Sequence, residues 1–218
     1  GSNAFIWKIK HNIIHHTYTN VDGIDDDIAK APVLRHAPTQ KWLPVHRYQH
    51  IYMFFLYSLS TILWVFLTDF MKYFSRKIVV TSMKISTKEH IIFWGSKLLY
   101  VGFYAVLPIA LVGWEAWLVG YLIINATIGL TISVVFQLAH VVEGTSFPLP
   151  DAEGRMEEAW AEHQMRTTAN FATQNKLAAF FLGGLNRQIE HHLFPKVCHI
   201  HYGEISLIVK RTAQEFNL

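Results

Sequence analysis

Three long apolar stretches constrain the fold of this chain more than any other feature. They cover residues 51–70, 91–112 and 115–138 of the 218-residue sequence. A helix that crosses a bilayer needs about 20 mostly apolar residues, and each stretch supplies them. A single stretch could be the core of a soluble domain, but three of them in close succession favour a membrane protein.

The composition supports the same class of protein. Hydrophobic residues make up 51% of the chain and charged residues only 16%, whereas a soluble domain carries about 25% charged residues. The single cysteine, Cys198, excludes an internal disulfide and favours a reducing compartment or a bilayer. A net charge of +3 gives no reason to expect a nucleic-acid partner. We therefore predict an all-α integral membrane protein.

Basic residues predict how the apolar stretches meet the bilayer. They lie on both sides of the stretch 51–70, and the turn at 113–115 contains none. The positive-inside rule places both basic segments in the cytoplasm. We therefore predict one domain over 1–218, in which helices 91–112 and 115–139 form a transmembrane hairpin. The stretch 51–70 is expected to lie at the interface or to re-enter, beside interfacial helices and a histidine-rich cytosolic helical cap.

Two segments rich in histidine flank the hairpin, and both are predicted to lie on the cytoplasmic side. They are HNIIHHTYTN (residues 11–20) and NRQIEHHLFP (residues 186–195). On an α-helix His11 and His15 lie about 40° apart, and His16 follows about 100° further round. A third candidate, His140, ends the last apolar stretch on the same predicted side.

The second segment presents Gln188, His191 and His192 within about 100° of helical arc. Each segment could therefore serve two neighbouring metal ions, because neutral imidazole is the commonest metal ligand. Histidines at the lipid headgroup level are the alternative interpretation. A structural zinc site usually includes cysteine, so a cysteine-free set of six histidines favours a redox metal pair.

These motifs resemble those of the membrane fatty-acid desaturases. HNIIHHTYTN has the H-x3-HH form of the second histidine box of that family. NRQIEHHLFP is similar to the third box in its Q-x2-HH form, which is associated with front-end desaturases. FQLAHVVEGTSFP (residues 136–148) and HQMRTTANF (residues 163–171) also resemble stretches of bacterial members. The resemblance covers nearly the whole chain.

The resemblance implies an O2-dependent desaturase with a non-haem centre of two iron ions on the cytosolic face. Its substrate would be an acyl lipid or an acyl-CoA, in a membrane that we expect to be the bacterial inner membrane. Electrons would come from an external b-type cytochrome or ferredoxin. The metal ligands carried over from the family are His11, His15, His16, His140, His191 and His192.

Further residues are weaker candidates for the site. Gln188 occupies a ligand position but is a poorer donor than histidine, so it could bind the metal or support a ligand. Glu143 and Glu190 are candidates for holding ligand rings by their second N–H. The substrate head group could meet Lys41, Arg47, Arg166 and Arg187. The acidic run at residues 21–30 lacks the spacing of a calcium loop and is predicted to be a solvated turn.

The first histidine box of the family lies upstream of the second, and the residues before His11 do not contain it. The chain therefore resembles the C-terminal two-thirds of a desaturase, and we expect weak or no activity from these 218 residues alone. A di-iron hydroxylase and a sphingolipid desaturase remain alternatives, since the same ligands support oxygen insertion. A membrane metal-binding or transport protein, or an inactive fragment, would belong to another class.

Overall fold

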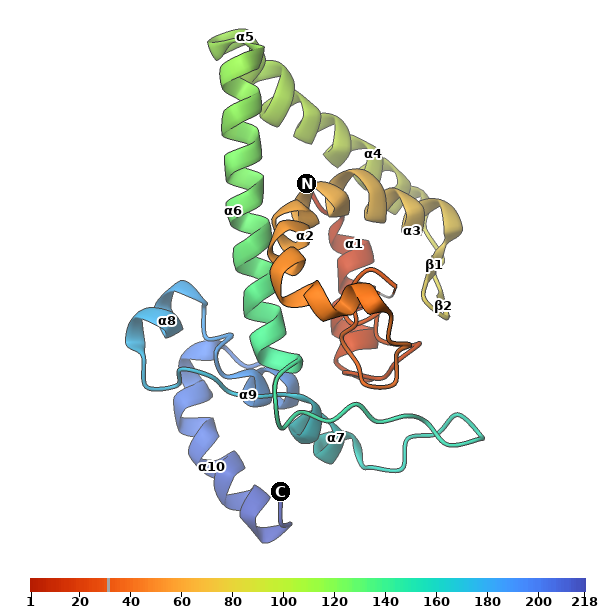
Figure 1. Cartoon of the computed structure of the whole chain (residues 1–218), viewed down its shortest axis with the longest axis vertical. Coiled ribbons are helices and arrows are strands. Elements are labelled where there is room, and N and C mark those ends of the chain that lie inside the picture. The colour runs from red at the N-terminus through yellow and green to blue at the C-terminus, as the bar shows by residue number, and fades with distance from the viewer. Residues whose placement is uncertain (31) are drawn as a thin grey trace. The chain divides into compact units, whose positions relative to one another are not determined.

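The computed structural model describes residues 1–30 and 32–218, and helices make up most of this part of the chain (Figure 1). Its strands are β1 (Lys77–Ile78) and β2 (Thr81–Ser82), an antiparallel pair with Lys77 opposite Ser82. The prediction of an all-α fold is confirmed. The described chain forms two compact units, which are Gly1–Asn12 with Arg47–Ser133 (unit 1) and Ile13–His46 with Val134–Leu218 (unit 2).

Most of the helices follow one another closely along the chain. Those from the chain start to the end of the longest helix are α1 (Ala4–Trp7), η1 (Lys8–His15), η2 (Pro44–Tyr48), α2 (Gln49–Leu63), η3 (Trp64–Thr68), α3 (Asp69–Ser75), α4 (Thr87–Val101), η4 (Gly102–Val106), α5 (Leu107–Val112) and α6 (Trp114–His140). The remaining ones, all in unit 2, are α7 (Trp160–Thr167), α8 (Lys176–Phe181), α9 (Gln188–Leu193), η5 (His199–His201) and α10 (Tyr202–Glu215). Long segments with no helix among their described residues separate η1 from η2 and α6 from α7.

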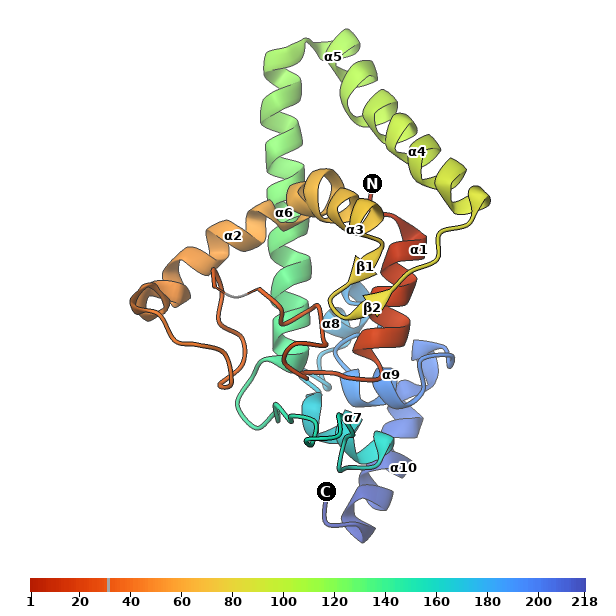
Figure 2. The same cartoon turned by 90° about the vertical axis from the view of Figure 1, so that its right-hand side faces the viewer.

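Three continuous helical segments in the described chain are long and apolar enough to cross a membrane. They are Pro44–Ser75, Thr87–Val112 and Trp114–His140, and Figure 2 shows the first of them running from α2 into α3. They contain the three apolar stretches found in the sequence, so the protein is a membrane protein. Which of them cross, and whether the first stays at the interface, remains a prediction.

Local sequence signals explain how the second and third of these segments begin and end. The Ser86 side chain accepts a hydrogen bond from Glu89 N and so caps the start of α4. Gly113 separates α5 from α6 with φ 81° and ψ 160°, a conformation that residues with a Cβ rarely adopt. The chain therefore reverses at this glycine (Figure 1).

Helix α2 packs closely against α6 in unit 1. A Cβ added at Gly129 would lie 2.6 Å from the carbonyl oxygen of Tyr57. One turn further along α2, Thr61 Oγ1 donates to the carbonyl oxygen of Asn125 at 3.0 Å. Small residues at such a crossing let two backbones approach in a membrane, where packing and hydrogen bonds drive helix association.

Candidate metal centre

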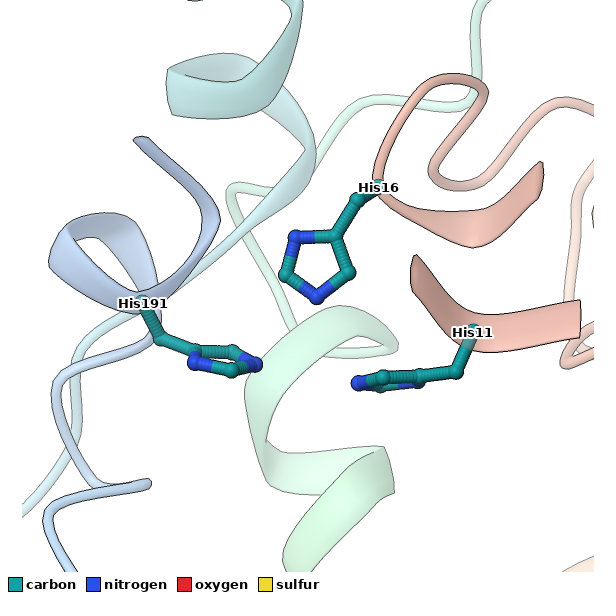
Figure 3. A group of neighbouring side chains, drawn as sticks. All are labelled: His11, His16 and His191. Carbon is teal, nitrogen blue, oxygen red and sulfur yellow. The ribbon is translucent and has the colours of Figure 1, made fainter. Parts of the chain in front are cut away.

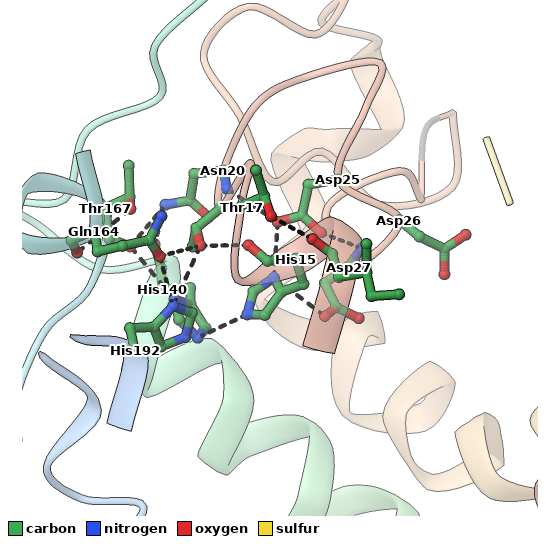
Figure 4. A network of polar contacts seen from close by, with 12 residues as sticks. His15, Thr17, Asn20, Asp25, Asp26, Asp27, His140, Gln164, Thr167 and His192 are labelled. Carbon is green, nitrogen blue, oxygen red and sulfur yellow. Dashed lines mark hydrogen bonds and ion pairs between the residues drawn. The ribbon is translucent and has the colours of Figure 1, made fainter. Parts of the chain in front are cut away.

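Three of the predicted ligands converge in unit 2. His15 ends η1, His140 ends α6 and His192 lies in α9. One ring nitrogen of each lies within 4.8 Å of the others, and all three side chains are buried. His15 Nε2 and His140 Nε2 are only 3.3 Å apart, as Figure 4 shows. Two unprotonated nitrogens would repel each other at this distance, so the pair fits a bound cation or a shared proton.

An aspartate fixes which nitrogen of His15 faces this group. His15 Nδ1 lies 3.0 Å from Asp25 Oδ2 (Figure 4), and a carboxylate can only accept, so Nδ1 carries the proton. Nε2 then presents its lone pair to His140. Asp25 is 0% exposed and also accepts a hydrogen bond from Asn20 N at 2.9 Å. The prediction of a solvated turn is therefore wrong for Asp25, because this carboxylate folds inward onto His15.

Oxygen acceptors orient the other two rings in the same way. His192 Nδ1 lies 2.8 Å from Gln164 Oε1, and His140 Nδ1 lies 3.3 Å from the carbonyl oxygen of Thr167. His192 Nε2 is buried without a hydrogen-bond partner among the described residues. Metal-binding histidines usually donate their second N–H to an oxygen in this manner. The donor set and its supports therefore fit a metal ion.

The buried amide of Asn20 ties the segments of the centre together. Its Nδ2 donates to the carbonyl oxygen of His140 at 2.7 Å and lies 3.3 Å from that of Thr167. Its backbone has φ 60°, a left-handed conformation that asparagine tolerates better than most residues. Asn20, Asp25 and Gln164 are not among the predicted site residues, although all three lie in segments with a motif of interest, 11–20, 21–30 and 163–171.

His16 and His191 form a second pair of rings in unit 2 (Figure 3). Their ring centroids are 4.8 Å apart and the rings meet edge to face. Trp160 Nε1 donates to the carbonyl oxygen of His16 at 2.9 Å and holds that residue against α7. His11 belongs to unit 1, where its ring stacks on Trp7 at 4.5 Å.

Burial keeps His16, His191 and His192 in the neutral form that binds metals. It lowers the pKa of His16 to about 3, with a further contribution from His191. Burial and then His15 lower the pKa of His191 to about 4. Burial and then His140 hold the pKa of His192 well below its usual value.

The helix that carries the first histidines differs from the one assumed from the sequence. Residues Lys8–His15 form a π-helix, with His16 in the turn that follows. Hydrogen bonds from residue i to i+5 place more residues in each turn than an α-helix does. The angles derived from α-helical geometry therefore do not apply to His11 and His15. The second cluster does lie on an α-helix, α9, as expected.

The three weaker candidates, Gln188, Glu190 and Glu143, differ in burial and in hydrogen bonding. Gln188 is buried and its Nε2 donates to the carbonyl oxygen of Leu185 at 2.8 Å. Buried Glu190 accepts a hydrogen bond from Asn170 Nδ2 at 2.9 Å. Glu143 is exposed, in the segment that follows α6. Neither glutamate belongs to a group of side chains that could hold a metal among the described residues.

The four basic residues predicted to bind the substrate head group lie at exposed or half-buried positions. Lys41, Arg47 and Arg166 are exposed, and Arg187 is half-buried with its guanidinium 3.4 Å from the carbonyl oxygen of Thr173. Arg166 pairs with two carboxylates of its own segment, Glu158 at 3.3 Å and Glu162 at 2.9 Å. A role in binding the head group stays a prediction for all four.

Comparison of the sequence with known proteins identifies the family of this chain. A family model described as fatty acid desaturase matches residues 1–218. The chain is 38% identical to an sn-1 linoleoyl-lipid 6-desaturase of Synechocystis sp., with 100% of the chain and 62% of that relative covered. It is 40% identical to an acyl-lipid (8-3)-desaturase of Physcomitrium patens, with 100% and 46% covered.

A third relative is an sn-1 linoleoyl-lipid 6-desaturase of Arthrospira platensis, which is 35% identical over 100% of the chain and 60% of its own length. The chain thus spans about half to three fifths of the length of these curated relatives. No solved structure matches it. Because the family model covers the chain from end to end, this chain belongs to the fatty acid desaturase family.

Proposed function

We propose that the protein containing this chain is an acyl-lipid desaturase of the front-end type. It would use two iron ions, O2 and electrons from a b-type cytochrome or ferredoxin to introduce a double bond into an acyl chain. The observation that carries the proposal is the convergence of His15, His140 and His192, each with its Nδ1 directed at an oxygen. The activities after which these relatives are named favour an acyl lipid over an acyl-CoA as substrate.

The proposed ligands divide into two groups. His15, His140 and His192 would hold one iron ion through Nε2. The second iron ion would take His16 and His191, whose rings are 4.8 Å apart, together with His11 on the basis of the H-x3-HH spacing. Histidine is a suitable ligand for iron, although the same nitrogens also accept other transition metals.

The irons would supply the oxidising power that removes two hydrogens from an unactivated methylene pair, which no protein side chain can supply. The chain's own part is to fix the ligands and to keep water away. Asp25 and Gln164 hold the rings of His15 and His192 through Nδ1. Both ligands are buried, which keeps water away from their ring nitrogens.

We further propose that the centre faces the cytoplasm of a bacterial inner membrane. The support is the set of basic residues on both sides of 51–70 and their absence from the turn at 113–115. In this topology 91–112 and 115–139 cross the bilayer. Labelling of single cysteines introduced at Trp114 and at Lys84, in a Cys198→Ser background, would place the two positions on opposite faces of inverted vesicles.

The proposed activity can be tested by expressing the whole protein that contains this chain in a bacterial host and analysing the lipid acyl chains by mass spectrometry. We expect products that have lost two hydrogens, together with about two iron ions per chain. His15→Ala and His192→Ala should each remove the product and most of the iron, while His50→Ala, at an exposed position, should retain both. Products that gain an oxygen, or purified protein that carries zinc and no iron, would contradict the proposal.

A further inference from the structure

We infer that Asp69, paired with Lys97, is a positioning residue that anchors the start of the helix carrying His11 and His15. Both residues lie in unit 1, in helices α3 and α4, far along the chain from the histidine boxes. The family motifs do not include them. The effect of Asp69 on metal binding rests on the proposed function, because it requires His11 to be a metal ligand.

The pair is buried and closely bonded. Asp69 is 0% exposed and Lys97 6% exposed, and Lys97 Nζ lies 2.7 Å from Asp69 Oδ2. Two charges removed from water in this way need each other, because either one left alone would be strongly destabilising. Charged residues inside membrane helices are rare and often have a function.

A π-helical turn brings the ammonium group to a backbone carbonyl as well. The Asp69 N–H bonds to the carbonyl oxygen of Trp64 instead of that of Val65, which an α-helix would use. Lys97 Nζ donates to Val65 O at 2.8 Å. Lys97 thereby fixes both the π-helical turn η3 and the Asp69 side chain that follows it. Such π-helical turns occur frequently at functional sites.

The Asp69 carboxylate also binds the first part of the chain. Asn3 N donates to Asp69 Oδ2 at 2.7 Å. The Asn3 side chain accepts a hydrogen bond from Ile6 N at 3.0 Å, which caps α1. The Asn3 carbonyl oxygen accepts from Trp7 N at 3.0 Å. One buried residue, Asn3, therefore transmits the position of Asp69 to the first turn of α1.

Helix α1 continues without a break into η1, because its last cap residue, Lys8, keeps helical dihedral angles. Helix α1 lies against α3 (Figure 2). A shift or rotation of the first turn would therefore move His11, which lies eight residues after Asn3 in the same unit. The negative carboxylate is also favourable at the positive end of this helix. Asp69 therefore acts within unit 1, on the start of the helix that carries His11.

The test uses the whole chain in lipid nanodiscs without metal and measures amide hydrogen exchange by mass spectrometry. Asp69→Ala should make the amides of residues 3–12 exchange at least about tenfold faster. The neutral double variant Asp69→Asn/Lys97→Met keeps an acceptor for Asn3 N and leaves no lone charge, so it should exchange at an intermediate rate. Asn125→Ala, which removes another buried polar contact of unit 1, is the control and should leave residues 3–12 unchanged.

Binding of Co²⁺ to the same proteins supplies the second measurement. Asp69→Ala should weaken Co²⁺ binding about tenfold, the double variant should recover part of the loss, and Asn125→Ala should bind as the wild type does. Exchange over 3–12 that is equally fast in Asp69→Ala and Asn125→Ala would overturn the inference. If Asp69→Ala does not fold, the double variant is the deciding measurement. Unchanged exchange of residues 3–12 in the double variant would overturn the inference. Faster exchange of residues 3–12, with unchanged exchange of residues 115–133, would support it.

The two proposals can fail separately. A wild-type chain that binds neither iron nor Co²⁺ would contradict the proposed function, while the exchange of residues 3–12 in metal-free protein would still decide whether Asp69 anchors the helix. A wild-type chain that binds metal, with variants of Asp69 that bind it equally well, would overturn the anchor alone.

Discussion

Asp25 Oδ2 lies 3.0 Å from His15 Nδ1, so an acid ten residues downstream selects the nitrogen that His15 turns toward His140 and His192. The acid, at 0% exposure, belongs to a run of charged residues that looks like a solvated turn in the sequence. Its partner histidine is buried as well. Such a buried pair in a polar cluster is best explained by a ligand that needs a fixed imidazole.

Replacement of Asp25 by asparagine should weaken metal binding by about 10- to 100-fold, because the His15 ring loses its charged acceptor. The matched control is Asp26→Asn, which removes a carboxylate of the same run that pairs with Lys30 at 3.9 Å. Metal content per chain after dialysis against a weak chelator measures the effect. Equal metal loss in both variants would show that Asp25 has no special part in the centre.

Gln164→Leu should weaken metal binding roughly tenfold, because His192 Nδ1 loses the oxygen that lies 2.8 Å away. Gln164→Glu retains an acceptor at the same place and should restore most of the binding. The absorption spectrum of the Co²⁺-loaded protein checks the geometry, which should change in the leucine variant alone. Identical spectra for the leucine variant and the wild type would contradict the assigned role.

Gly129→Ala should destabilise the protein by about 1–3 kcal/mol, because its Cβ would lie 2.6 Å from the carbonyl oxygen of Tyr57. Gly120→Ala on the same helix is the control, since a Cβ there meets nothing within 4 Å. The control should stay within about 1 kcal/mol of the wild type or gain stability. Thermal unfolding in detergent, followed by circular dichroism, would compare the two.

His36 should make the free energy of unfolding depend on pH. Burial, and then Lys30, lower the pKa of His36 from 6.5 to about 4. Between these two values the unfolded chain binds a proton at His36 and the folded chain does not, so stability falls as pH falls from about 6.5 toward 4. The full loss corresponds to about 3 kcal/mol. This contribution is present above pH 6.5.

His36→Gln removes the titrating group, and the free energy of urea unfolding should then fall less between pH 6.5 and 4 than in the wild type. Since other buried histidines also titrate, the comparison rests on the difference between the two proteins. His50→Gln, at an exposed position, should keep the wild-type pH dependence. A His36→Gln curve parallel to that of the wild type would show that His36 is protonated equally in both states.

The amino-acid sequence alone determined the class of the fold and predicted which histidines form the candidate site. The three apolar stretches became three long helices, because hydropathy acts through each segment's own composition. The histidines were also identified from local spacing, and His15, His140 and His192 do converge in the structure. These features depend on residues that lie close together in the chain or on a family pattern.

The tertiary structure alone decided how the site is held. It turned Lys8–His15 into a π-helix, folded Asp25 inward onto His15 and brought Gln164 to His192. It also paired Asp69 with Lys97. The three side-chain contacts join residues that are separated in the sequence, and the sequence around each residue does not indicate its partner. A hydrogen bond or ion pair of this kind forms because packing removes both groups from water, and only the folded chain determines which groups are buried together.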